Sequence, residues 1–191
     1  MLNPDTLAQR GRLLYRFKRP WRDGSGAARL FLNLREEKGY TYGVYSSFTA
    51  VKYPGPWQAY GDVRTEVTGG AMTEFFREFQ RIRDERVPAN ELEDAQRAIV
   101  ASFALSLESN DDLLGYAIIR KVYGFPNDYW DTYPAKIMAA TAADVQRVAR
   151  KYLNPENMQI VAVGDLSKIK PVMEKYGPVE VYDAEGKKVG N

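Results

Sequence analysis

Histidine and cysteine are both absent from this sequence, so carboxylates are the first candidates for general acid–base chemistry. Without imidazole or thiol, histidine zinc sites, Ser-His and Cys-His nucleophile pairs and disulfides are excluded. Two sets of carboxylates lie on or beside predicted helices, with no second ligand type near them, and we interpret both sets as solvated helical faces. They are Glu66, Glu74 and Glu78, and Glu91, Glu93 and Asp94.

A glycine-rich loop at Gly24-Ser25-Gly26 is the nearest approach to a phosphate-binding motif. It lacks a third glycine and a preceding strand, so it gives little support for a nucleotide site. The sequence therefore predicts no cofactor and no metal in this chain.

Charge is unevenly spread along the 191 residues. The formal net charge is only +2, but six cations and no acid lie between Arg10 and Arg22. Such an arm could bind nucleic acid or an anionic membrane, yet one short cationic run is weak evidence, and we favour a poorly ordered terminus. No apolar run reaches the ~20 residues of a membrane-spanning helix, and no signal peptide is recognisable, so the compartment stays open.

Composition divides the chain into a basic, divergent arm over residues 1–22, a domain over residues 23–176 and a polar tail over residues 177–191. The domain begins with an amphipathic helix that ends near Lys38-Gly39, where a glycine can adopt the left-handed cap conformation. Two strands, residues 40–51 and 57–64, then form an antiparallel hairpin. Alternation places Tyr42, Val44 and Phe48 on one side of the first strand, and Trp57, Ala59, Gly61 and Val63 on one face of the second.

A block of helices follows the break expected at Gly69-Gly70. Asn90 with Glu93 and Thr141 with Asp144 resemble capping pairs at two helix starts. The apolar run from Met158 to Val163 predicts a short buried strand, and a last helix follows it. The fold class is therefore α+β, an antiparallel sheet with helices packed on one face. So narrow a sheet would leave open edges, which favours a partner chain.

The segment Arg35-Glu36-Glu37-Lys38-Gly39-Tyr40-Thr41-Tyr42 carries the most specific pattern. Here the sequence resembles the pitrilysin/insulinase family of zinc peptidases (inverzincins), and specifically the carboxyl-terminal domain that lacks zinc. In that family a helix ends in a Leu-Arg-Glu-type turn, and a Tyr seven residues after the Arg opens a strand. Further agreement, in consistent order over residues 23 to 173, comes from Arg64-Thr65-Glu66, Gly69-Gly70, Glu91-Leu92, Thr141-Ala142-Ala143-Asp144-Val145 and Val163-Gly164-Asp165.

The resemblance implies two homologous α+β domains that face each other across a chamber, one with a His-x-x-Glu-His zinc site and the other with the Arg–Tyr pair. It implies that the Tyr42 hydroxyl donates to a developing oxyanion and that Arg35 holds a substrate carbonyl. Because this chain has no histidine, zinc is expected only in a partner chain, and no activity is expected from this chain alone. The leading hypothesis is that this chain is a zinc-free subunit of a metallopeptidase. It would contribute Arg35 and Tyr42 to a zinc-bearing homologous subunit, or would act in an oligomer. The substrate would be a polypeptide that binds as an added strand.

The resemblance also sets expectations that this sequence does not meet. A processing-peptidase-like half-unit normally begins with a strand and an apolar helix, and we expect both to be missing or divergent here, since the basic arm stands in their place. Members of this bacterial-looking type often act in the cell envelope or the cytoplasm.

Two alternatives remain open. Arg35 could cap carbonyls or pair with Glu36 or Glu37, while Tyr42 could be a core residue beside Val44. The chain could also be a structural or assembly module of the same fold with no part in proteolysis.

Overall fold

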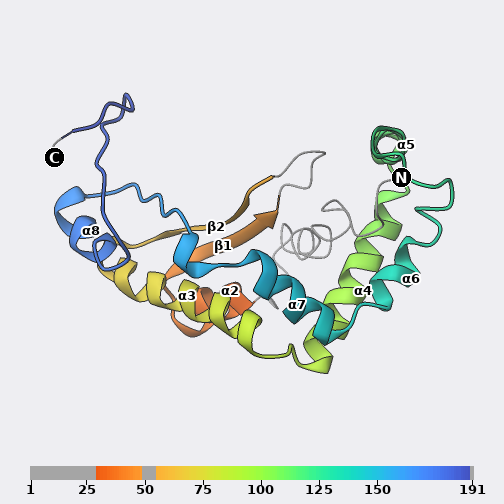
Figure 1. Ribbon diagram of the computed structural model, residues 1–191, viewed down its shortest axis with the longest axis horizontal. Helices are drawn as coiled ribbons and strands as arrows, with labels where there is room; N and C mark the ends of the chain where they lie inside the picture. Colours follow the sequence, from red (N-terminus) through yellow and green to blue (C-terminus); the bar gives the residue numbers. More distant parts are fainter. Residues whose placement is uncertain (1–28, 49–54, 190–191) are drawn as a thin grey trace.

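The computed structural model describes residues 29–48 and 55–189. The α+β class with an antiparallel sheet is confirmed, and Figure 1 shows a two-stranded hairpin above α2 and α3, with α4, α5 and α6 extending to the far end. In chain order the described elements are α2 (Arg29–Phe31), η2 (Leu32–Glu37), β1 (Thr41–Phe48), β2 (Trp57–Val63), η3 (Thr65–Val67), α3 (Thr68–Asp84), α4 (Ala89–Ser106), α5 (Asn110–Tyr123), α6 (Tyr133–Met138), α7 (Ala142–Tyr152), η4 (Pro155–Asn157) and α8 (Leu166–Met173).

The hairpin rests its inner face on α2, η2 and α3. Val44 of β1 packs with Leu34 of η2 and Ala71 of α3 in one core cluster. The predicted alternation along β2 is confirmed, since half-buried and exposed residues alternate from Trp57 to Val63. Trp57 meets Phe79 of α3 edge to face, with ring centroids 4.9 Å apart. Helices therefore cover one face of the sheet, as α+β packing requires.

A second core cluster lies at the other end of the molecule, between α4 and α6. Its buried members are Ile99, Phe103, Tyr129, Tyr133 and Ile137. The side-chain amide of Gln96, buried on α4, donates to the backbone carbonyls of Ile137, Met138 and Ala140 at 3.0, 3.1 and 2.9 Å. This amide donates to carbonyls at and just beyond the end of α6, and so joins α4 to α6.

The structure differs from three local expectations, which are the chain break at Gly69-Gly70, the capping pair at Asn90 and the strand over 158–163. Gly69-Gly70 lies inside the first turns of α3 and does not break the chain. A Cβ at Gly70 would lie 3.0 Å from the ring of Tyr40, so a larger residue there would require the ring to shift. The capping pair expected at Asn90 is wrong, since Pro88 precedes α4 and no side chain caps it. The capping box of Thr141 and Asp144 at the start of α7 is confirmed.

The expected buried strand over 158–163 is also wrong. These residues form no helix or strand, and Val163 is 98% exposed. An apolar run becomes a buried strand only where another strand pairs with it and a second layer covers it. Neither is present among the described residues, whose sheet consists of β1 and β2.

The ends of the chain add little to the described fold. The expected arm at 1–22 and the loop at Gly24-Ser25-Gly26 lie outside the described residues. The polar tail contains an isolated antiparallel bridge between Tyr182 and Lys188. Across 29–48 and 55–189, no helix is both long enough and apolar enough to cross a membrane. The division at residues 22 and 176 remains a prediction.

Candidate functional site

A wide helical turn positions Arg35. The apolar side chains of Leu30, Phe31 and Leu34 face the core, and Leu34 is completely buried. From Leu32 the helix widens into a π-helix, in which the Lys38 N–H donates to the carbonyl of Asn33 at 3.0 Å. Such wide turns are uncommon and are often found at functional sites.

Gly39 ends this turn, as the sequence predicts. Its φ of +60° is left-handed, which a glycine adopts without steric cost. The Tyr40 N–H then donates to the Leu34 carbonyl at 2.8 Å, and the Arg64 side chain donates to the Gly39 carbonyl at 3.1 Å. The end of β2 therefore braces the turn that leads into β1.

A bulge at the start of β1 turns Tyr42 to the outside. Thr41 pairs with Val63 and Val44 pairs with Gly61, so three steps along β1 oppose two along β2. Such an extra residue re-aims side chains. Tyr42 is consequently 86% exposed while Val44 is 4% exposed, and the expectation that the two share a face is wrong. The alternative that Tyr42 is a core residue is wrong for the same reason.

The Thr41 side chain stabilises this bulge. Its hydroxyl oxygen accepts from the Gly43 N–H at 3.1 Å and lies 2.6 Å from the Asp62 carbonyl and 2.8 Å from the Gly43 carbonyl. These contacts replace ladder hydrogen bonds that the bulge disrupts.

Arg35 and Tyr42 meet on the surface. The Arg35 guanidinium carbon lies 4.7 Å from the Tyr42 ring centroid and also 4.7 Å from that of Phe31. Its Nε lies 3.4 Å from a carboxylate oxygen of Glu36, so the ion pair expected in the alternative interpretation is present as well. A guanidinium held between two rings keeps its orientation while its N–H edges stay available to a ligand.

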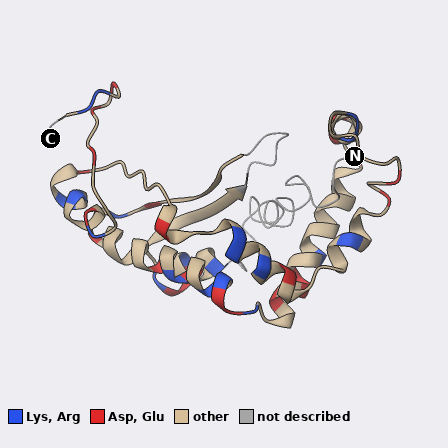
Figure 2. Ribbon diagram, in the orientation of Figure 1, with Lys and Arg blue, Asp and Glu red and all other residues tan. Residues whose placement is uncertain are grey.

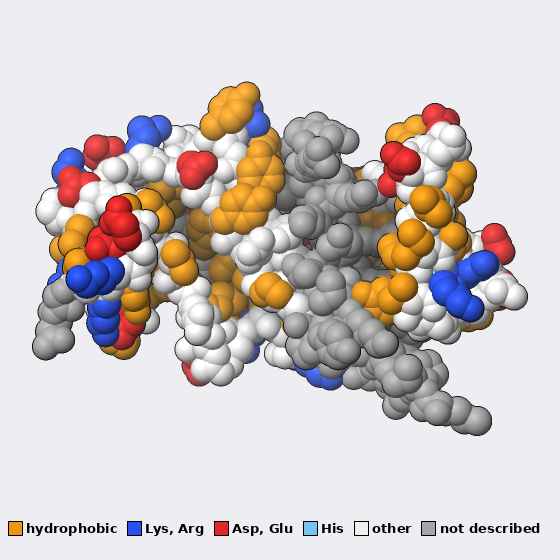
Figure 3. All heavy atoms as spheres, turned by 90° about the horizontal axis from the view of Figure 1, so that it is seen from above, with side chains coloured by type: hydrophobic (Ala, Val, Ile, Leu, Met, Phe, Trp, Pro, Cys, Tyr) orange, Lys and Arg blue, Asp and Glu red, His pale blue; other side chains and the backbone are white. Residues whose placement is uncertain are grey.

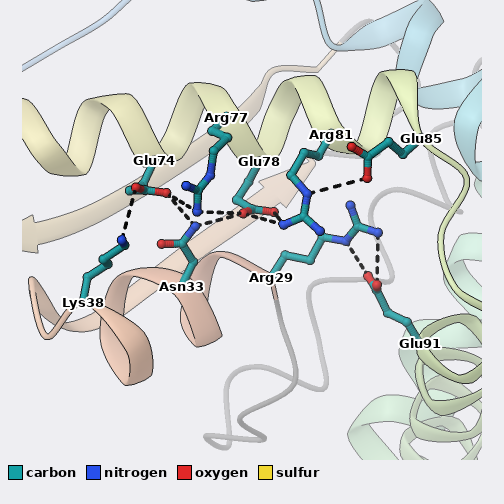
Figure 4. Close-up of polar contacts among 9 residues, drawn as sticks. All are labelled: Arg29, Asn33, Lys38, Glu74, Arg77, Glu78, Arg81, Glu85 and Glu91. Atoms are coloured by element: carbon teal, nitrogen blue, oxygen red, sulfur yellow. Dashed lines mark hydrogen bonds and ion pairs between the residues drawn. The ribbon is translucent and has the colours of Figure 1, made fainter.

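A cluster of charged side chains lies between η2 and α3 (Figure 4), and its carboxylates were misassigned from the sequence. Glu74 and Glu78 of α3 are only 8% and 3% exposed, so their interpretation as solvated residues is wrong. The Asn33 side-chain amide donates to Glu74 at 2.8 Å and to Glu78 at 2.9 Å. Burial is tolerated because each carboxylate is paired and hydrogen-bonded.

Cations from α3 and η2 balance these two carboxylates. Arg77 lies 2.6 Å from Glu74, and Arg81 donates to both oxygens of Glu78 at 2.9 and 3.0 Å. The carboxylate of Glu78 raises the pKa of the Arg81 guanidinium above its ordinary value. Lys38 approaches Glu74 at 3.8 Å. Figure 2 shows acidic and basic residues interspersed along α3.

The same cluster reaches α4. Arg29 donates to both carboxylate oxygens of Glu91, at 2.7 and 3.0 Å, and the Arg29 side chain is largely buried. Glu91 is thus a structural partner, whereas Glu66, Glu93 and Asp94 are exposed, as expected. No group of three or more His, Cys, Asp or Glu side chains in the described part of the chain could hold a metal ion.

Sequence reasoning missed Asn33 and the burial of the two glutamates. The signal was present in the spacing of α3, where Glu74 and Glu78 are four residues apart and Arg77 and Arg81 follow at i+3. That spacing places all four side chains along one side of the helix. Only the packing of η2 against α3 makes this side a buried one.

The sequence and the structure of this chain are both similar to those of known proteins. Residues 21–99 match the family model described as peptidase M16 inactive domain. The structure resembles the crystal structure of a peptidase M16 inactive domain from Pseudomonas fluorescens with a TM-score of 0.68 and 27% identity, over 78% of this chain and 35% of that one. The resemblance to the zinc-free domain of pitrilysin-type peptidases is thereby confirmed. No curated protein matches the chain.

Two further structures share the fold alone. A conserved protein from Enterococcus faecalis V583 gives a TM-score of 0.62 at 18% identity, over 76% of this chain and 33% of that one. A protease from Helicobacter pylori gives 0.65 at 16% identity, over 77% and 34%. The chain thus spans about a third of the length of each of these three structures.

Proposed function

From the match of residues 21–99 to the peptidase M16 inactive domain, we propose that this chain is a zinc-free component of a metallopeptidase assembly. In that assembly it contributes Arg35 and Tyr42 to peptide binding and to oxyanion stabilisation in a zinc-bearing homologous partner. The observation that carries the proposal is the stacking of the Arg35 guanidinium, 4.7 Å from the ring centroid of an almost fully exposed Tyr42.

The exposed pair has the chemistry that the role requires. A phenol hydroxyl is a neutral hydrogen-bond donor, and a donor held toward developing negative charge lowers the barrier to acyl transfer. The guanidinium stays charged at any physiological pH, so its donors are always available to a carbonyl oxygen. Phe31 and Tyr42 restrict the guanidinium before a ligand arrives, which reduces the entropy lost on binding. The zinc itself would be held by the partner's residues.

Apolar surface on the described residues favours a partner. Tyr45 and Tyr60 lie side by side on the outer face of the hairpin with ring centroids 5.5 Å apart, and both are more than 40% exposed. Val161 and Val163 are still more exposed, and Figure 3 shows further hydrophobic side chains facing outward at both ends of the molecule. A partner that covered these side chains would remove apolar surface from water, which favours association.

The test is association with a candidate partner. Purified chain is mixed with a homologous chain that carries a His-x-x-Glu-His sequence, and the mass of the mixture is measured by sedimentation velocity. A complex is expected to form, and Tyr45→Lys with Tyr60→Lys is expected to weaken it at least tenfold, since lysines would be desolvated at the contact. Glu93→Lys on α4, an exposed site outside the hairpin, is the matched control. Failure of the wild-type chain to associate would refute the proposal.

A second candidate function is an assembly module without catalytic contribution. The exposed apolar residues favour this role equally, because a partner that covers them need not take part in catalysis. A stable dimer of this chain with Tyr42 protected from solvent would support the assembly role and count against the catalytic one.

A further inference from the structure

We infer that Asn33 is a positioning residue for the Arg35–Tyr42 pair: its amide, held between Glu74 and Glu78, fixes the wide turn that carries Arg35 to Tyr42. The inference deepens the proposed function and rests on it for its biological meaning. The structural relationship itself can be tested in this chain alone.

The contacts of Asn33 are specific to an amide. Its Nδ2 has two protons, and the two carboxylates lie 2.8 and 2.9 Å away, so each proton has one acceptor. Asn33 is 3% exposed and cannot exchange these partners for water. A neutral donor suits the place, because another carboxylate there would be repelled by Glu74 and Glu78.

The position is not explained by stability alone. The carbonyl oxygen Oδ1 of Asn33 is buried and has no hydrogen-bond partner among the described residues. A buried acceptor without a partner costs about 1–3 kcal/mol. Residues that break a local rule in this way are concentrated at functional sites.

The clamp is the pair of hydrogen bonds from the Asn33 amide to Glu74 and Glu78. It acts on Arg35 through the backbone. The Asn33 carbonyl accepts the Lys38 N–H at 3.0 Å, which closes a turn containing Arg35, Glu36 and Glu37. Leu34, the next residue, is completely buried against β1 and α3. With Asn33 and Leu34 both fixed toward the core, the side chain of Arg35 is directed outward to β1, where the bulge presents Tyr42. If the clamp is lost, the turn can relax toward ordinary α-helical geometry, and Arg35 rotates away.

The experiment compares two buried amides in the full chain. Asn33→Leu removes the clamp while keeping the number and branching of the side-chain heavy atoms. Gln96→Leu is the matched control, because Gln96 is also buried and its amide also joins two helices, between α4 and α6. Nuclear Overhauser contacts between the Arg35 side chain and the Tyr42 ring are measured in each folded variant.

We expect Asn33→Leu to lose these contacts and Gln96→Leu to retain them. Retention in Asn33→Leu, or equal loss in both variants, would overturn the inference. If Asn33→Leu does not fold, Asn33→Asp takes its place. The contacts are then expected to be absent at neutral pH, where three carboxylates meet, and to return as the pH falls and the new carboxyl regains a proton to donate. Contacts that persist at neutral pH would overturn the inference.

Hydrolysis with a zinc-bearing partner separates this inference from the proposed function. If Asn33 acts through the pair, adding Asn33→Leu to a variant that already carries Arg35→Ala and Tyr42→Phe causes no further loss of rate, because the groups that Asn33 positions are already absent. A further loss of tenfold or more would contradict positioning. If Tyr42→Phe leaves hydrolysis unaffected, the proposed function fails, while the Overhauser contacts still decide the role of Asn33.

Discussion

The guanidinium of Arg35 lies over the ring of Tyr42, with 4.7 Å between the guanidinium carbon and the ring centroid. Two irregularities bring the residues together, a widened turn at the end of one helix and a bulge at the start of the next strand. Neither irregularity buries the pair, since Tyr42 remains almost fully exposed. The pair is therefore presented outward by the backbone and is available to a ligand or a partner.

The bulge predicts unequal losses of stability at two nearby residues. Tyr42→Ala is expected to change the free energy of unfolding by less than about 1 kcal/mol, because only an exposed cation–π contact is lost. Val44→Ala is expected to cost about 2 kcal/mol, because a buried side chain is truncated. Urea denaturation of both variants measures the difference. Equal costs would show that the two side chains share one environment.

Thr41 is expected to hold the bulge. Thr41→Val keeps the shape and removes a hydroxyl that contacts Gly43 and Asp62, so we expect a loss of about 1–3 kcal/mol in the free energy of unfolding. The control is Thr73→Val on α3, whose exposed hydroxyl donates to the Gly69 carbonyl. A cost no larger than that of the control would contradict a structural role for the Thr41 hydroxyl.

The ion pair of Arg29 and Glu91 is expected to stabilise the fold more than a surface pair. Its two hydrogen bonds join α2 to α4, and the Arg29 side chain is only 14% exposed. A double-mutant cycle with Arg29→Met and Glu91→Gln is expected to give a coupling energy of about 1.5–3 kcal/mol, typical of hydrogen bonds between charged groups. The exposed pair of Glu93 and Arg97 within α4 is the control, with an expected coupling below about 1 kcal/mol. Equal coupling energies would show that the Arg29–Glu91 pair stabilises the fold no more than a surface pair.

The cap of α7 predicts a dependence of stability on pH. Hydrogen bonds from Thr141, and then from Arg147, lower the pKa of Asp144 below its ordinary value. A carboxyl with a lowered pKa in the folded state stabilises it above the unfolded pKa of about 3.9, and this stabilisation is lost as the pH falls through the folded value. Asp144→Asn is therefore expected to cost about 0.3–1 kcal/mol at neutral pH.

The measurement is the free energy of unfolding of both proteins from about pH 7 to about pH 3. The difference between them is expected to shrink as the pH falls below about 4. Asp94→Asn, at an exposed site on α4, is the control. A difference that stays constant across this range would rule out the carboxylate of Asp144 as its source.

The α+β class, the hairpin, the glycine that ends η2 and the capping box of α7 could all be predicted, because local residues determine them. The face of Tyr42 could not be predicted, because a bulge inverts the alternation and depends on where β2 pairs. The burial of Glu74 and Glu78 depends on η2 packing over α3, which the spacing of α3 alone does not reveal. The run at 158–163 is strand-like in composition, but composition does not supply a neighbouring strand.

The most direct test of the central claim is the rate of peptide hydrolysis by a zinc-bearing homologous chain mixed with this chain or with its Tyr42→Phe variant. Phenylalanine keeps the ring over the guanidinium and removes the hydroxyl, and Tyr182→Phe, at an exposed tyrosine of the polar tail, is the matched control. We expect Tyr42→Phe to lower kcat by about 10²–10³-fold, as loss of an oxyanion donor does, and Tyr182→Phe to leave it unchanged. Equal rates for the wild-type chain and Tyr42→Phe would contradict the central claim.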